Sequence, residues 1–229
     1  MSLLADGVTR FEAAIRTTRR PVSYAEEAMR NGVEAFLRQR RPTARVVHEL
    51  VMDRGKARAD VCAIDLDHII SVEIKSQFDV TERLINQAAM FRLATPELWL
   101  FADERHERDC AILAYLMPSL GYAVTGEIEV RKASNEGRAP VWSVRREATW
   151  FRPDPEALLS LLWVAELTEE AVAARVISPP RSKPWTHKAL VARVLAVMTE
   201  AEMLAAVCRQ LRARKAEWRA DPPIWEGDA

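Results

Sequence analysis

An acid and a lysine, two residues apart, interrupt a run that otherwise has the character of a buried strand. The run AIDLDHIISVEIK, residues 63–75, is rich in Ile and Val and carries Glu73 and Lys75 near its end. Branched side chains favour sheets, and residues two apart on a strand share a face. Glu73 and Lys75 are therefore predicted to lie side by side, on the face opposite to Val72 and Ile74.

A second acid is predicted to face Glu73 across a hairpin. A two-residue turn at Leu66-Asp67 places Asp60 opposite Glu73, where side chains on one face lie about 5 Å apart. Two carboxylates that close repel each other unless a cation lies between them. Lys75 could help, but a divalent cation would do more because it prefers oxygen ligands and carries a double charge.

A plainer interpretation leaves Glu73 and Lys75 as a weak ion pair on a solvent-facing hairpin, which is a common arrangement. Neighbouring residues favour the chemical interpretation. Glu49 could deliver a third carboxylate, and Arg83 and Gln87 lie four residues apart on the next predicted helix, hence on one helix face. Taken singly, each of the three is also explained as an ordinary exposed polar residue.

This pattern resembles the PD-(D/E)xK nuclease superfamily. RADV, 58–61, stands at the first motif with Ala in place of the usual Pro, and EIKS, 73–76, matches the (D/E)xK motif. DVTERLINQAAMF, 79–91, resembles the helix that follows in small bacterial and phage proteins close to the MmcB-like group of DNA-repair endonucleases. Phe91 replaces the Tyr of the related QxxxY motif. The closer resemblance covers about residues 45–125.

The resemblance implies roles for the site residues. Asp60 and Glu73 would bind Mg²⁺ or Mn²⁺, with the backbone carbonyl of Ile74 and the side chain of Glu49 as further ligands. A metal held by acids lowers the pKa of bound water and screens the phosphate. Lys75 would orient or help deprotonate the attacking water.

Gln87 would position the water, the lysine or the scissile strand. Contacts to nucleic acid are expected from basic residues near the site and in the C-terminal part. These candidates are Arg58, Arg83, Lys183 and Lys188.

Composition limits the alternatives. The chain has 229 residues, 49% of them hydrophobic, and a formal net charge of zero, so any nucleic-acid surface must be local. Three widely spaced Cys without a CxxC pair argue against a structural zinc site. The sequence lacks a secretory signal and a long apolar run. We therefore expect a cytoplasmic protein, of bacterial or phage origin, without a membrane partner; homo-oligomerisation stays open.

The order of predicted elements indicates an α/β fold. We expect a restriction-endonuclease-like central mixed β-sheet flanked by helices over residues 1–151, and a helical C-terminal extension with a basic face over 152–229. Predicted helices are 8–20, 23–39, 81–94 with Asp79 or Thr81 as its cap, 103–117, 155–177 and 186–216. Predicted strands are 59–65, 68–75, 97–102, 121–130 and 141–150, with a helix or strand at 45–52.

Together with these residues, the resemblance implies a Mg²⁺-dependent nuclease that hydrolyses phosphodiester bonds in DNA. The resemblance alone implies a repair, phage or defence context. The alternative is a catalytically silent nucleic-acid-binding or scaffolding protein with the same fold. An enzyme of the same fold that acts on RNA is a third interpretation.

Overall fold

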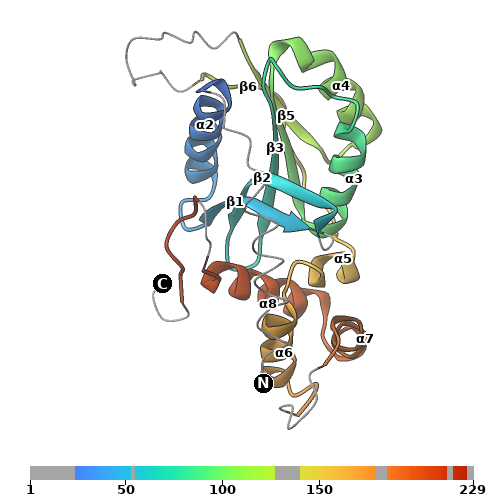
Figure 1. Ribbon diagram of the computed structural model, residues 1–229. Coiled ribbons are helices and arrows are strands. Elements are labelled where there is room, and N and C mark those ends of the chain that lie inside the picture. Colours follow the sequence, from blue (N-terminus) through green and yellow to red (C-terminus); the bar gives the residue numbers. More distant parts are fainter. Residues whose placement is uncertain (1–23, 53–54, 127–139, 179–184, 216–218, 226–229) are drawn as a thin grey trace, which may run out of the picture.

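A mixed sheet of six strands forms the centre of the protein (Figure 1). The computed structural model describes residues 24–52, 55–126, 140–178, 185–215 and 219–225. The strands lie in chain order, antiparallel from β1 to β3, parallel from β3 to β5, and antiparallel again at β6. They are β1 (Arg45–Met52), β2 (Ala57–Ile64), β3 (Ile69–Lys75), β4 (Glu97–Asp103), β5 (Gly121–Thr125) and β6 (Ser143–Arg146).

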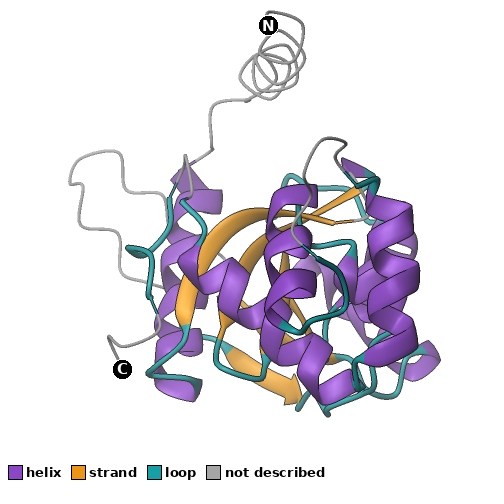
Figure 2. Ribbon diagram, turned by 90° about the horizontal axis from the view of Figure 1, so that it is seen from below, coloured by secondary structure: helices purple, strands orange, loops and turns teal. Residues whose placement is uncertain are grey.

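Helices cover both faces of this sheet, so the predicted α/β fold with C-terminal helices is confirmed (Figures 1 and 2). α2 packs on one face, where Met29, Val33 and Leu37 meet Val72 and Trp99. α3 and α4 pack on the other face. The helices are α2 (Tyr24–Arg40), α3 (Leu84–Ala94), α4 (Glu107–Leu116), α5 (Pro155–Leu159), α6 (Val164–Ala173), α7 (His187–Val197) and α8 (Glu200–Ala213), with a 3₁₀ turn at Glu104–His106.

The hairpin of β2 and β3 has the predicted register. Ile64 pairs with Ile69, and Val61 pairs with Val72. Continuing this register by one residue places Asp60 opposite Glu73. All of β3 except Lys75 is buried, because helices cover both faces of the sheet at this central strand. The solvent-facing hairpin is therefore excluded.

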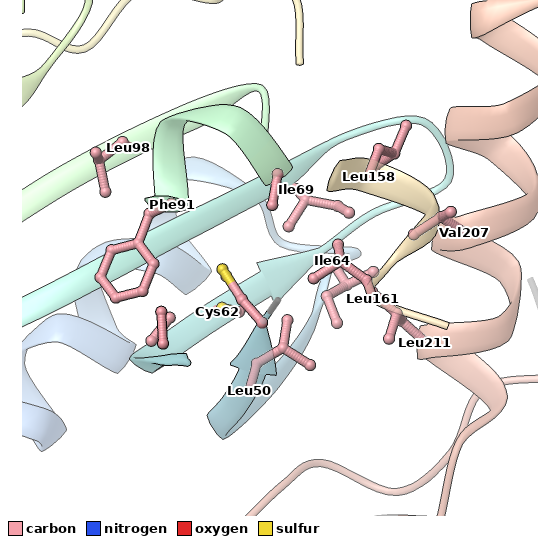
Figure 3. Close-up of a cluster of buried hydrophobic side chains, with 14 of the residues drawn as sticks. Leu50, Cys62, Ile64, Ile69, Phe91, Leu98, Leu158, Leu161, Val207 and Leu211 are labelled. Carbon is pink, nitrogen blue, oxygen red and sulfur yellow. The ribbon is translucent and has the colours of Figure 1, made fainter. Parts of the chain in front are cut away.

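The C-terminal helices share a hydrophobic core with the sheet (Figure 3). At the turn end of the hairpin, Ile64 and Ile69 lie in one cluster with Leu158, Val207 and Leu211. The long helices predicted after residue 152 are each divided in two. Asp154 caps α5, and Thr199 and Glu202 form a capping box that starts α8.

A short segment after α8 closes the free edge of β1. Ala220 forms a β-bridge with Val47, and the backbone N–H of Asp221 donates to the carbonyl of Val46 at 2.9 Å. The Asp221 carboxylate also accepts from the N–H of Val46 and from Arg38. An edge strand with unpaired backbone groups is thereby covered.

Two expectations near the site differ from the structure. α3 starts at Leu84 rather than at 81, and its first turn has no side-chain cap. Asp79 is engaged instead by Ser76, whose N–H and hydroxyl both donate to its carboxylate at 2.7 and 2.6 Å. Thr81 donates to Asp109 at 2.6 Å. Asp79 and Thr81 therefore stabilise the loop before α3 and do not cap the helix.

Several predictions fall wholly or partly outside the described residues. The helix at 8–20, the first residue of the helix at 23–39 and the last four residues of the strand at 121–130 belong to this group. Among the described residues, no helix is both long and apolar enough to cross a membrane.

Candidate functional site

Acids on three neighbouring strands stand at one level of the sheet. In the register of β1 and β2, His48 pairs with Val61 and Leu50 pairs with Ala59, so Glu49 stands level with Asp60. The register of β2 and β3 places Asp60 level with Glu73. The topology therefore brings residues 49, 60 and 73, the three acids named from the sequence, to one level of the sheet.

The backbone is irregular at this level. Glu49 has a φ of 59°, in the left-handed region that a non-glycine residue seldom adopts. Val47 and Leu50 lie in the same hydrophobic cluster although their positions along the strand differ by three. The alternation of side chains along β1 is therefore shifted by one residue at Glu49. Such conformations are held against their strain by the surrounding structure and gather at functional sites.

Asp60 is fixed by contacts from two directions. Its Oδ2 accepts a hydrogen bond from the backbone N–H of Ile74 at 2.7 Å, and its Oδ1 accepts one from Arg30 at 3.2 Å. Burial raises the pKa of Asp60 to about 6, against the opposing effect of the Arg30 charge and the Ile74 N–H, with the Glu49 charge raising it further. The carboxylate is thus held between β3 and α2.

Glu73, Lys75 and Gln87 form a connected group. Lys75 Nζ donates to Oε1 of Glu73 at 2.8 Å and to Oε1 of Gln87 at 3.3 Å. The Glu73 side chain is buried, with 3% of the residue exposed, and its Oε2 has no hydrogen-bond partner among the described residues. Burial and the charge of Asp60 raise the pKa of Glu73 to about 8, although Lys75 and a hydrogen bond with the Gln87 side chain oppose this.

Lys75 is held in its charged form. Burial lowers its pKa, but the charge of Glu73 and the hydrogen bond to it outweigh that effect, so that the pKa lies above the ordinary value. An ammonium with a raised pKa gives up its proton reluctantly. Of the two roles predicted for Lys75, the arrangement favours orienting a bound group over accepting a proton.

The structure also identifies Arg30 on α2, which the sequence prediction missed. Its guanidinium donates to Oε1 of Glu49 at 2.7 Å and to the carbonyl of Asp60 at 2.8 Å, and it also contacts Glu26 and His48. The residue is 2% exposed. The sequence offered one indication of this residue. Glu26 and Arg30 lie four residues apart, as in an ion pair on one helix face, and Arg30 follows the buried Met29.

Glu49 is engaged on both carboxylate oxygens. Arg30 binds Oε1, and Nε of Arg58 lies 2.5 Å from Oε2. Its predicted role as a metal ligand stays a prediction, but its carboxylate is held by two guanidinium groups. Arg58, predicted to contact nucleic acid, is exposed and forms this ion pair.

The other predicted nucleic-acid contacts are dispersed. Arg83 is exposed at the start of α3, and Lys188 is exposed on α7. α7 belongs to the C-terminal helices near the turn of the hairpin, whereas Lys75 lies at the other end of β3 (Figure 1). Lys183 lies outside the described residues.

Much of the predicted basic face points inward. Arg209 pairs with Glu170, Arg214 pairs with Glu166, and Arg212 is buried. Arg219 pairs with acids of α2. These four residues stabilise the packing of the C-terminal segment and do not present a free basic surface, while Lys188 and Lys215 are exposed.

The donor set fits a hydrated divalent ion. Within the described ranges, no group of three or more His, Cys, Asp and Glu side chains is placed to hold a metal. Asp60 and Glu73 remain as two carboxylates, one with an unpartnered buried oxygen. Mg²⁺ commonly binds through one or two carboxylates and keeps several waters, so two acids suffice for that ion.

A pocket lies away from these acids. It has a volume of about 630 Å³ and is bordered by the hairpin turn, the segment before α5 and the start of α8, with Asp67, Trp150 and Met203 among its lining residues. It contains none of the predicted site residues. The chemistry predicted from the sequence is therefore not located in this pocket.

Comparison with known proteins identifies a family and a similar solved structure. The family model described as bacteriophage P4 protein cII matches residues 21–219. A protein of unknown function from Silicibacter pomeroyi is similar in structure, with 15% sequence identity, a TM-score of 0.40, and coverage of 72% of this chain and 99% of that chain. No curated protein matches the sequence.

Proposed function

We propose that this chain, which belongs to the bacteriophage P4 protein cII family, is a metal-dependent nuclease that hydrolyses phosphodiester bonds in DNA. The observation that carries the proposal is Glu73, a buried acid that stands level with Asp60, accepts from Lys75 through Oε1 and has an unpartnered Oε2. A buried carboxylate with a raised pKa and a specific charge partner is a candidate functional group.

In this proposal Asp60 and Glu73 hold Mg²⁺ or Mn²⁺, with the Ile74 carbonyl as a further ligand. The ion supplies a bound water of lowered pKa and screens the phosphate charge. Glu49 contributes indirectly, because its carboxylate holds Arg30 and Arg58. Asp60 on β2 and Glu73 on β3 are therefore the acids that bind the metal directly.

The remaining residues act on the phosphate and on each other. Lys75 offers a fixed ammonium that attracts a phosphate oxygen and offsets the charge that develops on the phosphate during hydrolysis. Gln87 orients that ammonium by accepting its hydrogen bond at 3.3 Å. The hydrogen bonds between Ser76 and Asp79 fix the loop directly after Lys75.

The surface beside Lys75 supports a nucleic-acid substrate. Phe78 is 71% exposed on the loop that follows β3, and Val80 and Ile85 are exposed nearby in sequence. Exposed aromatic rings beside basic groups suit bases as well as phosphates, and Arg83 lies in the same segment. We place the protein in the cytoplasm, in a phage, repair or defence context. The family name agrees with a phage context.

A second candidate function is a nucleic-acid-binding or scaffolding protein without turnover. The observation that favours it is the pairing of Arg30 with both Glu49 and Asp60. This pairing satisfies acids that would otherwise attract metal, and a protein that never binds metal would gain stability from it.

The deciding experiment is cleavage of labelled single-stranded, double-stranded and branched DNA, and of RNA, with Mg²⁺ or Mn²⁺. The wild type is compared with Glu73→Gln and with Glu82→Gln, an exposed acid in the same loop. We expect metal-dependent cutting of DNA by the wild type and Glu82→Gln only. Equal cutting by Glu73→Gln would refute the site. Binding of nucleic acid without cutting by any variant would favour the second candidate.

A further inference from the structure

We infer that Arg30 is the permanent second cation of this site, and that the protein therefore binds one divalent metal ion per chain, at Asp60 and Glu73. This inference rests on the proposed function and deepens it. A pair of metal ions in a nuclease shares acidic ligands between two positive centres. Here the guanidinium bridges Glu49 and Asp60, at 2.7 and 3.2 Å.

The contacts of Arg30 are those of a bridging cation. Its Nη2 group donates to Glu26, Glu49 and Asp60, and its Nη1 group donates to the carbonyl of Asp60. Arginine suits this position because its planar fork carries several donors in fixed directions. An ion at the same position would have to displace a guanidinium that is already bonded to each acid.

The surroundings of Arg30 hold it in place. Nη1 of Arg30 lies 3.3 Å from Nδ1 of His48, and Nε2 of His48 lies 2.9 Å from Oε1 of Glu34. Because a guanidinium can only donate, Nδ1 of His48 accepts from Arg30 and Nε2 of His48 donates to Glu34. Arg219 pairs with Glu34 from the segment after α8. Arg30 is thus supported from two elements besides its own helix.

Glu49, Asp60 and Glu73 stand at one level of the sheet. Of these three acids, Glu73 is the one that does not contact Arg30. Arg30 bonds to Glu49 and Asp60, while the partner of Glu73 is Lys75. The ion pairs of Arg30 are with Glu49 and Asp60 and do not reach Glu73, whose Oε2 accepts no hydrogen bond from the described residues. The position between Glu49 and Asp60 is therefore filled by Arg30, and the position between Asp60 and Glu73 is suited to a metal ion.

The test counts bound Mn²⁺ by electron paramagnetic resonance and calorimetry, with no substrate present. The proteins are the wild type, Arg30→Gln, the double variant Arg30→Gln/Glu49→Gln, and the control Arg38→Gln on the same helix, where Arg38 pairs with Asp221. We expect one Mn²⁺ for the wild type and the control. Arg30→Gln should bind a second Mn²⁺ through the released acids, and the double variant should return to one.

The outcomes separate this inference from the proposed function. Two Mn²⁺ in the wild type, or a single Mn²⁺ in folded Arg30→Gln, would overturn the inference and leave the nuclease proposal standing. No Mn²⁺ in the wild type would overturn both. If Arg30→Gln does not fold by circular dichroism, Arg30→Lys decides instead: one Mn²⁺ supports the inference, and two contradict it.

Discussion

Oδ2 of Asp60 lies 2.7 Å from the backbone nitrogen of Ile74, the residue between Glu73 and Lys75. The first acid of the site is thus bonded to the strand that carries the second acid and the lysine. Its position depends on the β3 backbone as well as on its own strand. A substitution at Asp60 therefore changes the geometry of both strands, whereas one at Glu73 or Lys75 is the cleaner probe of chemistry.

Replacing Lys75 tests the chemical role of the ammonium. Lys75→Ala should reduce cleavage by about 10²–10³-fold, the range for loss of one positioned donor that stabilises charge in the transition state. Mn²⁺ binding should be retained, because Lys75 contacts Glu73 without being a ligand. Single-turnover cleavage and Mn²⁺ titration measure the two effects separately. Undiminished cleavage would remove Lys75 from the mechanism.

Replacing Gln87 tests the positioning of Lys75. Gln87→Ala should lower the rate of cleavage by about 10–100-fold, as is usual when a group that orients a site residue is lost. The matched control is Asn86→Ala, an exposed neighbour on α3. The rate at saturating substrate should fall more than the affinity for DNA. An equal effect of both substitutions would show that α3 matters only structurally.

Glu73 makes the stability of the metal-free protein depend on pH. Its pKa is about 8 in the folded protein, against an ordinary value of 4.5 for an exposed glutamate, so the folded state binds the proton more tightly. The contribution is fully present below pH 4.5 and is lost as pH rises through 8. In EDTA, the wild type should lose stability over this range, and Glu73→Gln should be more stable by about 1–3 kcal/mol at about pH 8.

Urea unfolding at about pH 5 and about pH 8 measures this difference. Asp60, with a pKa of about 6, contributes in the same direction and is present in both proteins. Glu82→Gln, which alters an exposed acid, should follow the wild type at both values. Parallel pH profiles for the wild type and Glu73→Gln would show that Glu73 is ionised at little cost.

Removing Arg30 should destabilise the fold strongly. Arg30→Met leaves Glu49 and Asp60 without their shared partner, and breaking a buried ion pair from one side costs about 3–5 kcal/mol. The exposed pair of Arg38 and Asp221 should contribute at most about 1 kcal/mol when Arg38→Met removes it. Urea unfolding in EDTA compares them. Similar losses for both would mean that Arg30 contributes no more than a surface ion pair.

The sequence located the hairpin and its acids because their determinants are local. Alternating Ile and Val and a short turn set the register of β2 and β3, and with it the pairing of Asp60 and Glu73. Arg30 was missed because its contact with Asp60 spans thirty positions and depends on how α2 packs on the sheet. The left-handed backbone of Glu49 could not be predicted from the sequence, because that conformation is expected of glycine and not of glutamate.

The segment at residues 219–221 links the edge of the sheet to the site. It closes β1 through the bridge between Ala220 and Val47, and Arg219 bonds through Glu34 and His48 toward Arg30. The protection of the sheet edge against pairing with another chain and the support of the site therefore depend on the same few residues.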